Sequence, residues 1–476
     1  MQNFTLMVNN LDSLVWSMVL VGLCLGVGLY LTIRLRFVQF RLLKDMVQQL
    51  LSDKGSADGI SSFQAFATTV GARVGMGNIA GIASAIYYGG PGAIFWMWVI
   101  TCIGAASAFT ESALGQAFKE RTAVGTFIGG PSYYLEKCLG SKRYAIVFAV
   151  VAALGPGLLM PGVQVNSLVT VFEEAFGVSR LACGLVTCGL LTFVVCGSIM
   201  RIARLAEFLA PFMCLIYIGL AIGIIGMHFS ELPGVLMLIV NSAMGLDPLL
   251  GGILGAAISW GVKRGIYSNE AGMGCGAIVS AAAVCSHPAK QGLIQAFSIY
   301  VDSLFVGTAT ALIILLTGSY NVTDGSMLLI DHVGALESGI KWTQFALVNT
   351  YGSWCGKLLA IIIVLFVFTS MTGYCYQAEA NVHYLFKNNR LAIHICRAVF
   401  VLASFMGCLV EAEAMWAMGD IGYGLLAWAN IIAIALLAPT ACKLLRDYEE
   451  QKAAGIPPVF DPAKCGIEDP TGAWKP

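Results

Sequence analysis

Apolar stretches long enough to cross a lipid bilayer recur along the whole chain. A bilayer core about 30 Å thick requires about 20 apolar residues in a helix. Eleven stretches have this length: residues 13–33, 61–86, 91–118, 143–172, 181–199, 203–227, 248–285, 291–318, 356–385, 391–410 and 415–441. Of the 476 residues, 58% are hydrophobic and 11% are charged. This composition excludes a soluble globular protein and predicts an all-α polytopic membrane protein with 11 transmembrane helices.

The basic residues predict how these helices are oriented. With the N-terminus outside the cell, the cytoplasmic segments contain 20 Lys and Arg residues, whereas the opposite loops contain two, Arg180 and Lys341. Cytoplasmic loops of membrane proteins carry such an excess of Lys and Arg. We therefore expect an odd number of spans, with the N-terminus outside and the C-terminus in the cytoplasm.

Charge and composition exclude several kinds of partner. The 27 basic and 27 acidic residues balance, so no net positive field attracts nucleic acid. The 15 cysteines include no CxxC pair, and the five histidines lie on separate segments, so neither residue type has the spacing of a metal site. No pattern indicates an organic cofactor. The lipid bilayer is an expected partner, and the oligomeric state stays open.

One short pattern occurs twice, in the second and in the seventh apolar stretch. Arg73–Gly81 (RVGMGNIAG) and Arg264–Gly272 (RGIYSNEAG) share R-x4-N-x-A-G at a distance of 191 residues. Five spans separate the two stretches, so the second copy crosses the membrane in the opposite direction. Inverted repeats of this kind are common in transporters. The sequence therefore predicts an inverted 5+5 helix repeat that follows one extra N-terminal helix.

These features divide the chain into five parts. We expect the extra transmembrane helix and a cytoplasmic linker in 1–60, and the first five-helix repeat in 61–228. An extracellular or periplasmic connection is expected in 229–247, the second repeat in 248–441 and a cytoplasmic tail in 442–476.

Glycines interrupt both copies of the pattern. Gly71, Gly75 and Gly77 surround Arg73, and five glycines fall within 261–276. Each Gly in a helix interior costs about 1 kcal/mol relative to Ala, so we expect two broken helices. Unwound backbone at membrane depth lines a cavity or is buried in protein, and the N-H groups of half-helices attract a carboxylate there. The alternative is that the glycines serve close helix packing.

Four stretches of the sequence resemble the alanine or glycine:cation symporter family. They are 63–81 (FQAFATTVGARVGMGNIAG), 89–98 (GGPGAIFWMW), 129–134 (GGPSYY) and 269–274 (NEAGMG). The resemblance extends from about Phe37 to Asp461. It implies a leucine-transporter-like fold and sodium-coupled uptake of small neutral amino acids through a bacterial inner membrane. Many relatives carry a small hydroxyl residue where Arg73 stands, so the identity of the substrate stays open.

A second resemblance concerns the co-transported sodium ion. The stretch GARVGMGN that begins at Gly71 is similar to the G-x-x-V-G-x-G-N stretch of neurotransmitter:sodium symporters. This similarity implies that the carbonyls of Gly71 and Val74 bind one sodium ion. It also implies that the backbone near Met76 and Gly77 binds the substrate carboxylate, and that Asn78 serves a second sodium site.

The same resemblance implies that the eighth core helix supplies the other half of the first sodium site. Phe366, Thr369 and Ser370 have the required spacing of a carbonyl at i and hydroxyls at i+3 and i+4. These positions share one helix face, and sodium, a hard cation, prefers oxygen ligands. The alternative is that the two hydroxyls bond back to the preceding helical turn.

Placing an ionisable side chain inside a membrane span costs at least about 2.5 kcal/mol, so such residues are candidates for a functional role. The candidates are Arg73, Glu111, Glu207, Lys263, Arg264, Glu270, Asp302, Glu379 and Arg397. Arg73 and Glu270 belong to the two expected breaks, so we expect them to form a gating ion pair. Glu111 and the substrate are the other candidate partners of Arg73. For Glu111 and Asp302, a paired carboxylate that fixes helix register is an equal alternative to a transport role.

The expected substrate site contains Arg73, Met76, Gly77, Asn78 and Glu270, and amide side chains complete it. Gln164 and Asn166 lie in the span 143–172, and Asn269 precedes Glu270 in the second break. Amides can bind an ammonium and a carboxylate without a fixed charge. The family resemblance favours Gln164 as a substrate contact, and it leaves Asn166 open between substrate binding and hydrogen bonds between helices.

Together these features predict a secondary active symporter that couples sodium entry to uptake of a small neutral amino acid. Alanine, glycine, serine and glutamine are the candidate substrates. The alternative is a proton-coupled transporter that uses Glu111, Glu270 or Asp302. A channel has no use for two half-helix motifs in inverted repeat, and an intramembrane enzyme would need paired catalytic groups, which the sequence lacks.

Overall fold

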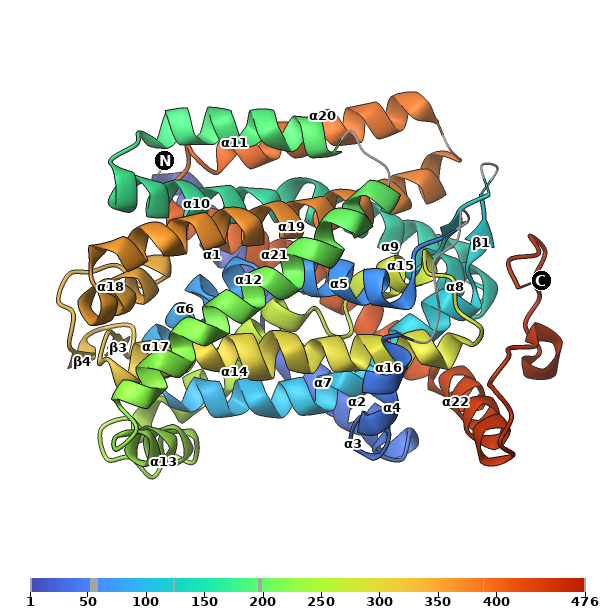
Figure 1. Cartoon of the computed structure of the whole chain (residues 1–476), viewed down its shortest axis with the longest axis horizontal. Helices are drawn as coiled ribbons and strands as arrows, with labels where there is room; N and C mark the ends of the chain where they lie inside the picture. Colours follow the sequence, from blue (N-terminus) through green and yellow to red (C-terminus); the bar gives the residue numbers. More distant parts are fainter. Residues whose placement is uncertain (1, 52–58, 123–124, 196–198, 388, 475–476) are drawn as a thin grey trace.

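Helices make up most of the chain in the computed structural model, which describes residues 2–51, 59–122, 125–195, 199–387 and 389–474. Figure 1 shows many of the long helices running between two ends of the molecule. The N-terminus is drawn toward the end that carries α18, and the C-terminus lies beyond α22 at the other end.

The first part of the chain is a series of helices with one small hairpin. In chain order the elements are α1 (Gln2–Val15), α2 (Met18–Arg34), α3 (Val38–Arg41), α4 (Leu43–Gln49), α5 (Ser62–Arg73), η1 (Met76–Asn78), α6 (Ala80–Gly89), α7 (Gly92–Ala117), β1 (Glu120–Arg121), β2 (Phe127–Ile128), α8 (Pro131–Lys137), α9 (Lys142–Leu154), η2 (Gly155–Leu159), α10 (Pro161–Phe176), α11 (Arg180–Val195), α12 (Ile199–Met227) and α13 (Leu232–Ala243).

The second part has the same character. Its elements are η3 (Gly251–Ile253), α14 (Leu254–Asn269), α15 (Cys275–Ala281), α16 (Pro288–Ile299), η4 (Tyr300–Gly307), α17 (Thr308–Leu316), β3 (Asn321–Thr323), β4 (Leu328–Asp331), α18 (Ile340–Tyr351), α19 (Ser353–Phe386), α20 (Arg390–Met406), α21 (Ala412–Leu436), α22 (Ala438–Ala453) and η5 (Pro462–Cys465). Each strand pair is antiparallel, with Glu120 opposite Ile128 and Asn321 opposite Asp331.

Local sequence signals account for many of the helix ends. Ser61 and Gln64 form a capping box at the start of α5, because each side chain accepts a hydrogen bond from the backbone N-H of the other residue. Proline opens α10 and α16, where its missing N-H has no helical partner to lose. Gly177 ends α10 in the left-handed conformation, at φ 65°.

Each of the expected ranges contains helix among the residues that the structure describes. Seven helical runs in the described part of the chain are long and apolar enough to cross a membrane by themselves. The expected ranges 61–86 and 248–285 are each divided into two helices, α5 and α6 in the first range and α14 and α15 in the second. α7 lies among these segments and packs against α14, α15 and α16.

The N-terminal helix differs from the prediction. The expected first span begins at residue 13, but helix begins at Gln2, and α1 meets α2 at Trp16. The indole Nε1 of Trp16 donates to the carbonyl of Asp420 at 2.8 Å, and Asp12 Oδ2 lies 2.7 Å from Lys263 Nζ. Polar residues of α1 therefore have partners on α14 and α21, which a hydropathy argument does not detect.

The connection expected at 229–247 contains the helix α13. Pro233 lies in the first turn of α13, and Ile239 and Ala243 face a cluster of buried side chains. Ser242 Oγ accepts a hydrogen bond from the N-H of Gly92 at 3.0 Å. The connection is therefore packed against the start of α7.

The C-terminal tail is held against the loop between α15 and α16. The N-H of Phe460 donates to the carbonyl of Ser286 at 2.8 Å, and His287 Nε2 lies 3.0 Å from Asp447 Oδ2 of α22. The ring of His287 is fully buried, and this burial lowers its pKa below the usual 6.5. His287 Nδ1 accepts the N-H of Ala289 and so caps α16.

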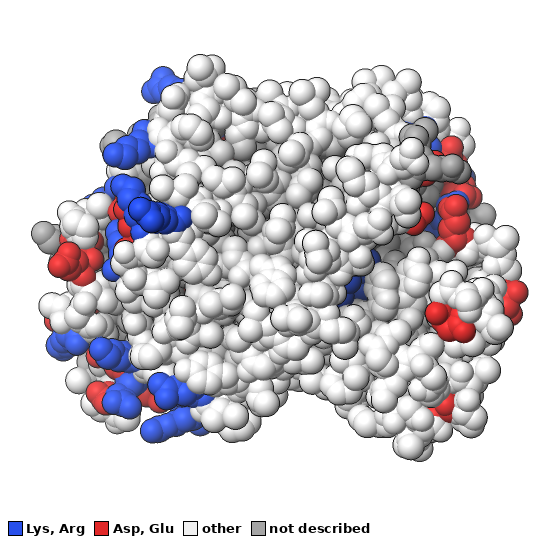
Figure 2. Space-filling view, turned by 180° about the vertical axis from the view of Figure 1, so that it is seen from behind, with Lys and Arg blue, Asp and Glu red and all other residues white. Residues whose placement is uncertain are grey.

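The charged side chains gather at the two ends of the molecule. Figure 2 shows a broad band almost without charged residues, with Lys and Arg concentrated at one end. That end is the one that carries the C-terminus in Figure 1. Such a band matches the apolar core of a bilayer.

Candidate functional site

Both predicted breaks in helices are present. α5 ends at Arg73, and Val74 leaves the helical region with ψ 88° before the short turn η1 and α6. α14 ends at Asn269, and Glu270 adopts the left-handed conformation with φ 55°. Gly272 at φ 82° and Gly274 at φ 89° follow, a conformation that glycine adopts without strain.

Asn269 shapes the second break. Its Oδ1 accepts the N-H of Ala271 at 3.0 Å, and its Nδ2 lies 3.4 Å from Thr101 Oγ1. Asn269 was predicted to bind substrate, but in this structure its amide turns the chain and contacts α7.

The two breaks lie directly against each other. A Cβ atom built on Gly77 would lie 2.9 Å from Tyr267 Cδ1 and 3.3 Å from Ser268 Cα. No side chain other than hydrogen fits at position 77 without movement of α14. This close approach is one physical reason for a glycine in the first break.

A cluster of oxygen-bearing side chains joins the two breaks to η4. Asp302 Oδ1 accepts from Asn78 Nδ2 at 2.5 Å, and Asp302 Oδ2 accepts from Ser268 Oγ at 2.7 Å and from Ser303 Oγ at 2.9 Å. Asn78 Oδ1 is a second acceptor within hydrogen-bond distance of Ser268 Oγ, and the carbonyl of Arg73 accepts from Asn78 Nδ2 at 3.4 Å. We call Asn78, Ser268, Asp302 and Ser303 the Asp302 cluster.

The chemistry of the Asp302 cluster suits a hard cation. Asp302, Asn78 and Ser268 are fully buried, and they supply a carboxylate, an amide oxygen and a hydroxyl. The sequence identified Asn78 and Asp302 but not their connection, and it missed Ser268 and Ser303. Residues 300–307 form a π-helical turn, which sets the positions of Asp302 and Ser303 toward the break.

Residues predicted for the first sodium site lie close together where α5 packs against α19. Ser370 Oγ donates to the carbonyl of Gly71 at 3.2 Å, and a Cβ on Gly71 would lie 3.1 Å from Thr369 Cβ. Thr369 Oγ1 bonds to the carbonyls of Leu365 and Phe366 at 2.9 and 3.0 Å. Ser370 therefore bridges the two helices, whereas the Thr369 hydroxyl makes the bond to its own helix that was the stated alternative.

A chain of polar side chains leads from the first break to the second. The N-H of Met76 donates to Gln164 Oε1 at 3.3 Å, and Gln164 Nε2 donates to the hydroxyl of Tyr374 at 3.2 Å. The hydroxyls of Tyr374 and Tyr423 lie 2.5 Å apart, and Tyr423 donates to Glu270 Oε1 at 3.4 Å. Met76, Gln164 and Glu270, all predicted substrate contacts, thus belong to one network.

Asn166 does not join this network. Its Nδ2 donates to the carbonyls of Gly407 and Val410 at 2.9 and 3.1 Å, near the end of α20. Of the two alternatives stated for Asn166, this geometry supports hydrogen bonding between helices.

Arg73 does not form the predicted ion pair with Glu270 in this structure. Its Nη1 donates to Ser298 Oγ and, at 3.5 Å, to the carbonyl of Gln295 on α16. Its Nε and Nη2 have no hydrogen-bond partner among the described residues. The left-handed backbone of Glu270 directs the carboxylate to Tyr423, whereas the end of α5 directs Arg73 toward α16.

Glu111 lies beside the guanidinium of Arg73 without bonding to it. A Cβ built on Gly276 would lie 2.7 Å from Arg73 Nη2 and 3.5 Å from Glu111 Oε1, so the absence of a side chain there leaves both groups room. Glu111 Oε2 accepts from the N-H of Gly274 at 2.8 Å and from Asn430 Nδ2 at 3.1 Å. Glu111 therefore anchors the second break to α7, beside the Arg73 side chain.

A second group of buried charges was not anticipated as a unit. Arg264 binds Asp420 through two hydrogen bonds of 2.7 and 3.0 Å, and Lys263 Nζ lies 2.8 Å from Asp420 Oδ2. The guanidinium of Arg264 also lies 4.9 Å from the ring centre of Trp416. Arg264 is part of the repeated pattern, but nothing in the sequence marked Asp420 as its partner.

Comparison with known proteins decides the family. The profile of the sodium:alanine symporter family matches residues 1–462. The chain belongs to the sodium:alanine symporter family. It is 47% identical to the Bacillus subtilis protein named "Putative sodium/proton-dependent alanine carrier protein YrbD", over 97% of this chain and 96% of that protein. It is 44% identical to the "Sodium/proton-dependent alanine carrier protein" of Bacillus sp. strain PS3, over 89% of this chain and 96% of that protein.

A third relative indicates the function of the family, and one solved structure shows the fold. A third relative, 44% identical over 94% of this chain and 91% of its own length, is the "Probable sodium/glutamine symporter GlnT" of Bacillus subtilis. The crystal structure of MhsT in complex with L-phenylalanine shares the fold, with a TM-score of 0.56 at 14% identity, covering 82% of this chain and 99% of that one. The protein is therefore an integral membrane transporter for cation-coupled amino-acid symport, and not an enzyme.

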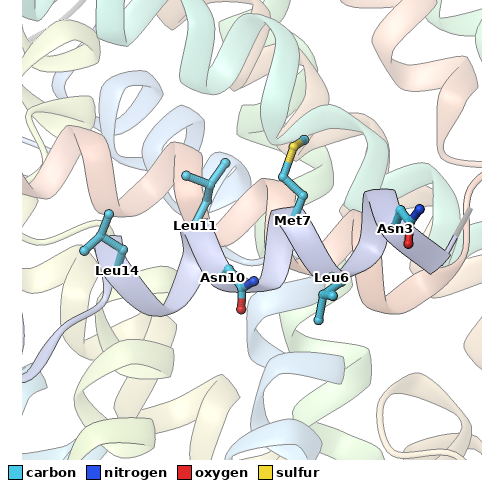
Figure 3. A pocket seen from close by; sticks show the side chains of 6 residues that line it. All are labelled: Asn3, Leu6, Met7, Asn10, Leu11 and Leu14. Carbon is cyan, nitrogen blue, oxygen red and sulfur yellow. The ribbon is translucent and has the colours of Figure 1, made fainter.

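A surface pocket of this sodium:alanine symporter family member lies on α1, apart from the two breaks. Figure 3 shows it on the surface of α1, and its lining side chains all belong to that helix: Asn3, Leu6, Met7, Asn10, Leu11 and Leu14. None of the residues at the two breaks contributes to it.

Proposed function

We propose that this protein is a secondary active symporter that couples sodium entry to the uptake of a small neutral amino acid by alternating access. The observation that carries the proposal is the Asp302 cluster, a buried set of oxygen ligands that joins both broken helices. An ion bound there contacts α14, η1 and η4 at once. Its binding therefore stabilises one arrangement of the two breaks over others, which is what coupling requires.

We propose two sodium positions. One is the Asp302 cluster, with the carbonyl of Arg73 as a further oxygen. The other lies between α5 and α19, with Gly71, Val74 and Phe366 as carbonyl ligands and Thr369 and Ser370 as hydroxyl ligands. Support for the second position comes from the 3.2 Å hydrogen bond between Ser370 and Gly71. When sodium binds, we expect the hydroxyls of Thr369 and Ser370 to turn from their present acceptors toward the ion.

The substrate is proposed to lie beside the two breaks. The N-H groups of Met76 and Gly77 would bind its carboxylate, and Gln164 and Glu270 would bind its ammonium group. Glu270 Oε2 is fully buried and has no hydrogen-bond partner among the described residues, so it is available to a cationic group. Free acceptors of this kind are costly unless a ligand or water satisfies them.

The surroundings of the substrate position favour a small side chain. Tyr267 and Tyr423 have ring centres 4.1 Å apart, and Tyr267 also contacts Gly77 closely. Both rings are almost completely buried. Alanine and glycine fit such surroundings best, with serine and glutamine as further candidates, and the names of the relatives point to alanine and to glutamine.

Proton coupling is the second candidate mechanism. Arg73 is one positive group in the region of three buried carboxylates, those of Glu111, Glu270 and Asp302. A sodium ion at Asp302 and a substrate ammonium at Glu270 would balance the remaining negative charges, and protons would balance them equally. Two relatives carry names that include both sodium and protons.

Topology and internal symmetry are part of the same proposal. We propose that α5–α12 and α14–α21 form the two inverted repeats, with α5 and α14 as the first half-helix of each repeat. We also propose that the end rich in Lys and Arg in Figure 2 faces the cytoplasm. This places the C-terminus inside and the N-terminus outside.

Uptake of radiolabelled alanine into proteoliposomes tests the coupling ion. Four conditions separate the candidates: a sodium gradient alone, a proton gradient alone, both gradients and neither. We expect uptake with the sodium gradient alone and none with the proton gradient alone. Uptake driven by protons in the complete absence of sodium would assign the carboxylates to proton coupling instead.

Competition by unlabelled compounds tests the substrate class in the same vesicles. Glycine, serine and glutamine should compete with labelled alanine, because each carries the ammonium and carboxylate that the proposed site binds. Ethylamine lacks the carboxylate and should not compete. Strong competition by ethylamine would remove the proposed role of Met76 and Gly77.

A further inference from the structure

One face of α16 carries polar side chains along its whole length. Gln291, Gln295 and Ser298 stand at positions i, i+4 and i+7, and Asp302 follows four residues later in η4. Residues at this spacing share a helix face. All four side chains are fully buried. A continuous polar stripe thus runs from the first turn of α16 to the Asp302 cluster.

The far end of the stripe lies at the basic end of the molecule. Gln291 Nε2 donates at 3.1 Å to the hydroxyl of Ser62, the first residue of α5. His287, which caps α16, contacts Asp447 of α22. These contacts place the start of α16 beside the C-terminal helix. With the proposed topology, the stripe leads from the Asp302 cluster to the cytoplasm.

The stripe contains polar atoms that the present conformation leaves unsatisfied. Gln291 Oε1 and Gln295 Nε2 are buried, and neither has a hydrogen-bond partner within the described ranges. Most buried polar atoms in proteins are paired, so exceptions call for a physical explanation. An apolar side chain would avoid the penalty at both positions. The two glutamines therefore carry a cost in this conformation that an apolar residue would not.

Arg73 lies across the stripe. Its guanidinium donates to Ser298 Oγ and to the carbonyl of Gln295, and its own carbonyl accepts from Asn78 of the Asp302 cluster. A cation that leaves Asp302 along α16 would therefore meet a fixed positive charge after one helical turn. Two positive charges separated by about one helical turn repel each other strongly in a buried site.

We propose that the polar face of α16 is the route by which the co-transported cation leaves the Asp302 cluster, and that Arg73 is a tethered positive charge that closes this route. Arg73 is the last residue of α5, so movement of this half-helix withdraws the guanidinium and opens the path. Gln291, Gln295 and Ser298 then offer successive oxygen ligands to the ion. The inference rests on the proposed function, because it takes the Asp302 cluster as a cation site.

Flux of sodium-22 into proteoliposomes in the absence of any amino acid tests the closing role of Arg73. We expect Arg73→Gln to admit sodium at least about tenfold faster than the unchanged protein, because the repelling charge is gone. Arg73→Lys is the matched control, since it keeps a positive charge on the same half-helix and should stay closed. The double variant Arg73→Gln, Glu111→Gln removes one charge of each sign and should also admit sodium. It keeps the test informative if the single variant does not fold.

Two substitutions on α16 test the route itself. Gln295→Leu removes a polar step, so exit of sodium-22 from preloaded vesicles during alanine efflux should slow by about tenfold with external sodium affinity unchanged. Ile294→Val, a neighbouring change on another face of the helix, should have no effect.

The outcomes separate this inference from the proposed function. If the unchanged protein shows no sodium-dependent uptake, the proposed function fails and this inference fails with it. If uptake is sodium-coupled but the two Arg73→Gln proteins stay closed and Gln295→Leu releases sodium at the normal rate, only this inference is overturned.

Discussion

Replacing Asp302 by Asn removes the formal negative charge from the proposed cation site while keeping its shape. At an effective dielectric constant of about 20, a unit charge about 4 Å from a monovalent cation contributes about 4 kcal/mol. A difference of about 1.4 kcal/mol is a tenfold change in affinity, so the charge is worth nearly three orders of magnitude. The carbonyl oxygen of the new Asn side chain still attracts the cation and restores part of this binding energy. We expect Asp302→Asn to raise the sodium concentration for half-maximal uptake by about 100-fold.

Alanine uptake in proteoliposomes, measured over a range of external sodium concentrations, gives this value directly. Ser303→Ala is the matched control, because it removes one hydrogen bond of 2.9 Å to Asp302 Oδ2 and leaves the charge in place. A net contribution of about 0.5–1.5 kcal/mol for such a bond predicts at most about a tenfold change.

The result that would refute the reasoning is an unchanged sodium requirement in Asp302→Asn protein that still transports. The carboxylate would then have no electrostatic contact with the ion. If Asp302→Asn instead abolished a dependence of uptake on external pH and left the sodium requirement intact, Asp302 would be a proton site.

Three further substitutions test other parts of the structure. Ser370→Ala removes the hydroxyl that lies 3.2 Å from the Gly71 carbonyl, so half-saturating sodium in uptake assays should rise about three- to tenfold; an unchanged value would remove Ser370 from the ion site. Gly77→Ala places a Cβ 2.9 Å from Tyr267 Cδ1, so calorimetric binding of alanine to the purified, folded protein should be lost, and wild-type affinity would contradict the close approach. Burial lowers the pKa of His287 below 6.5, so its contribution to stability is complete above about that pH and is lost as the pH falls further; the melting temperature in detergent should therefore fall less between pH 7.5 and 5.5 in His287→Asn than in the unchanged protein, and equal losses would exclude this histidine as a cause.

The helices and their interruptions could be read from the sequence because both depend on local properties. A stretch of about 20 apolar residues forms a helix in a bilayer whatever surrounds it, since every backbone group must find a partner within the segment. The two breaks at 73–81 and 264–272 were predicted because glycines weaken a helix at any position. The structure confirms both breaks, with Glu270 and Gly272 in the left-handed conformation.

Features that depend on contacts between distant segments were missed or misjudged. The length of the apolar stretch gave no indication that α1 begins at Gln2, because polar residues of α1 have partners on α14 and α21. The predicted pairing of Arg73 with Glu270 assumed that the charged side chains of the two symmetry-related breaks point toward each other. The structure instead directs Arg73 toward Ser298.

The sequence by itself determined the membrane class, the approximate spans, the family motifs and the positions of the two interrupted helices. Only the tertiary structure decided which side chains meet at those interruptions. Asn78, Ser268 and Asp302 come from segments up to 224 residues apart, and their meeting depends on the rotation and depth of three packed helices. A one-residue change in the π-helical turn at 300–307 would rotate Asp302 away from the other two. Such rotations are set by the packing of whole helices, and no local pattern in the sequence encodes them.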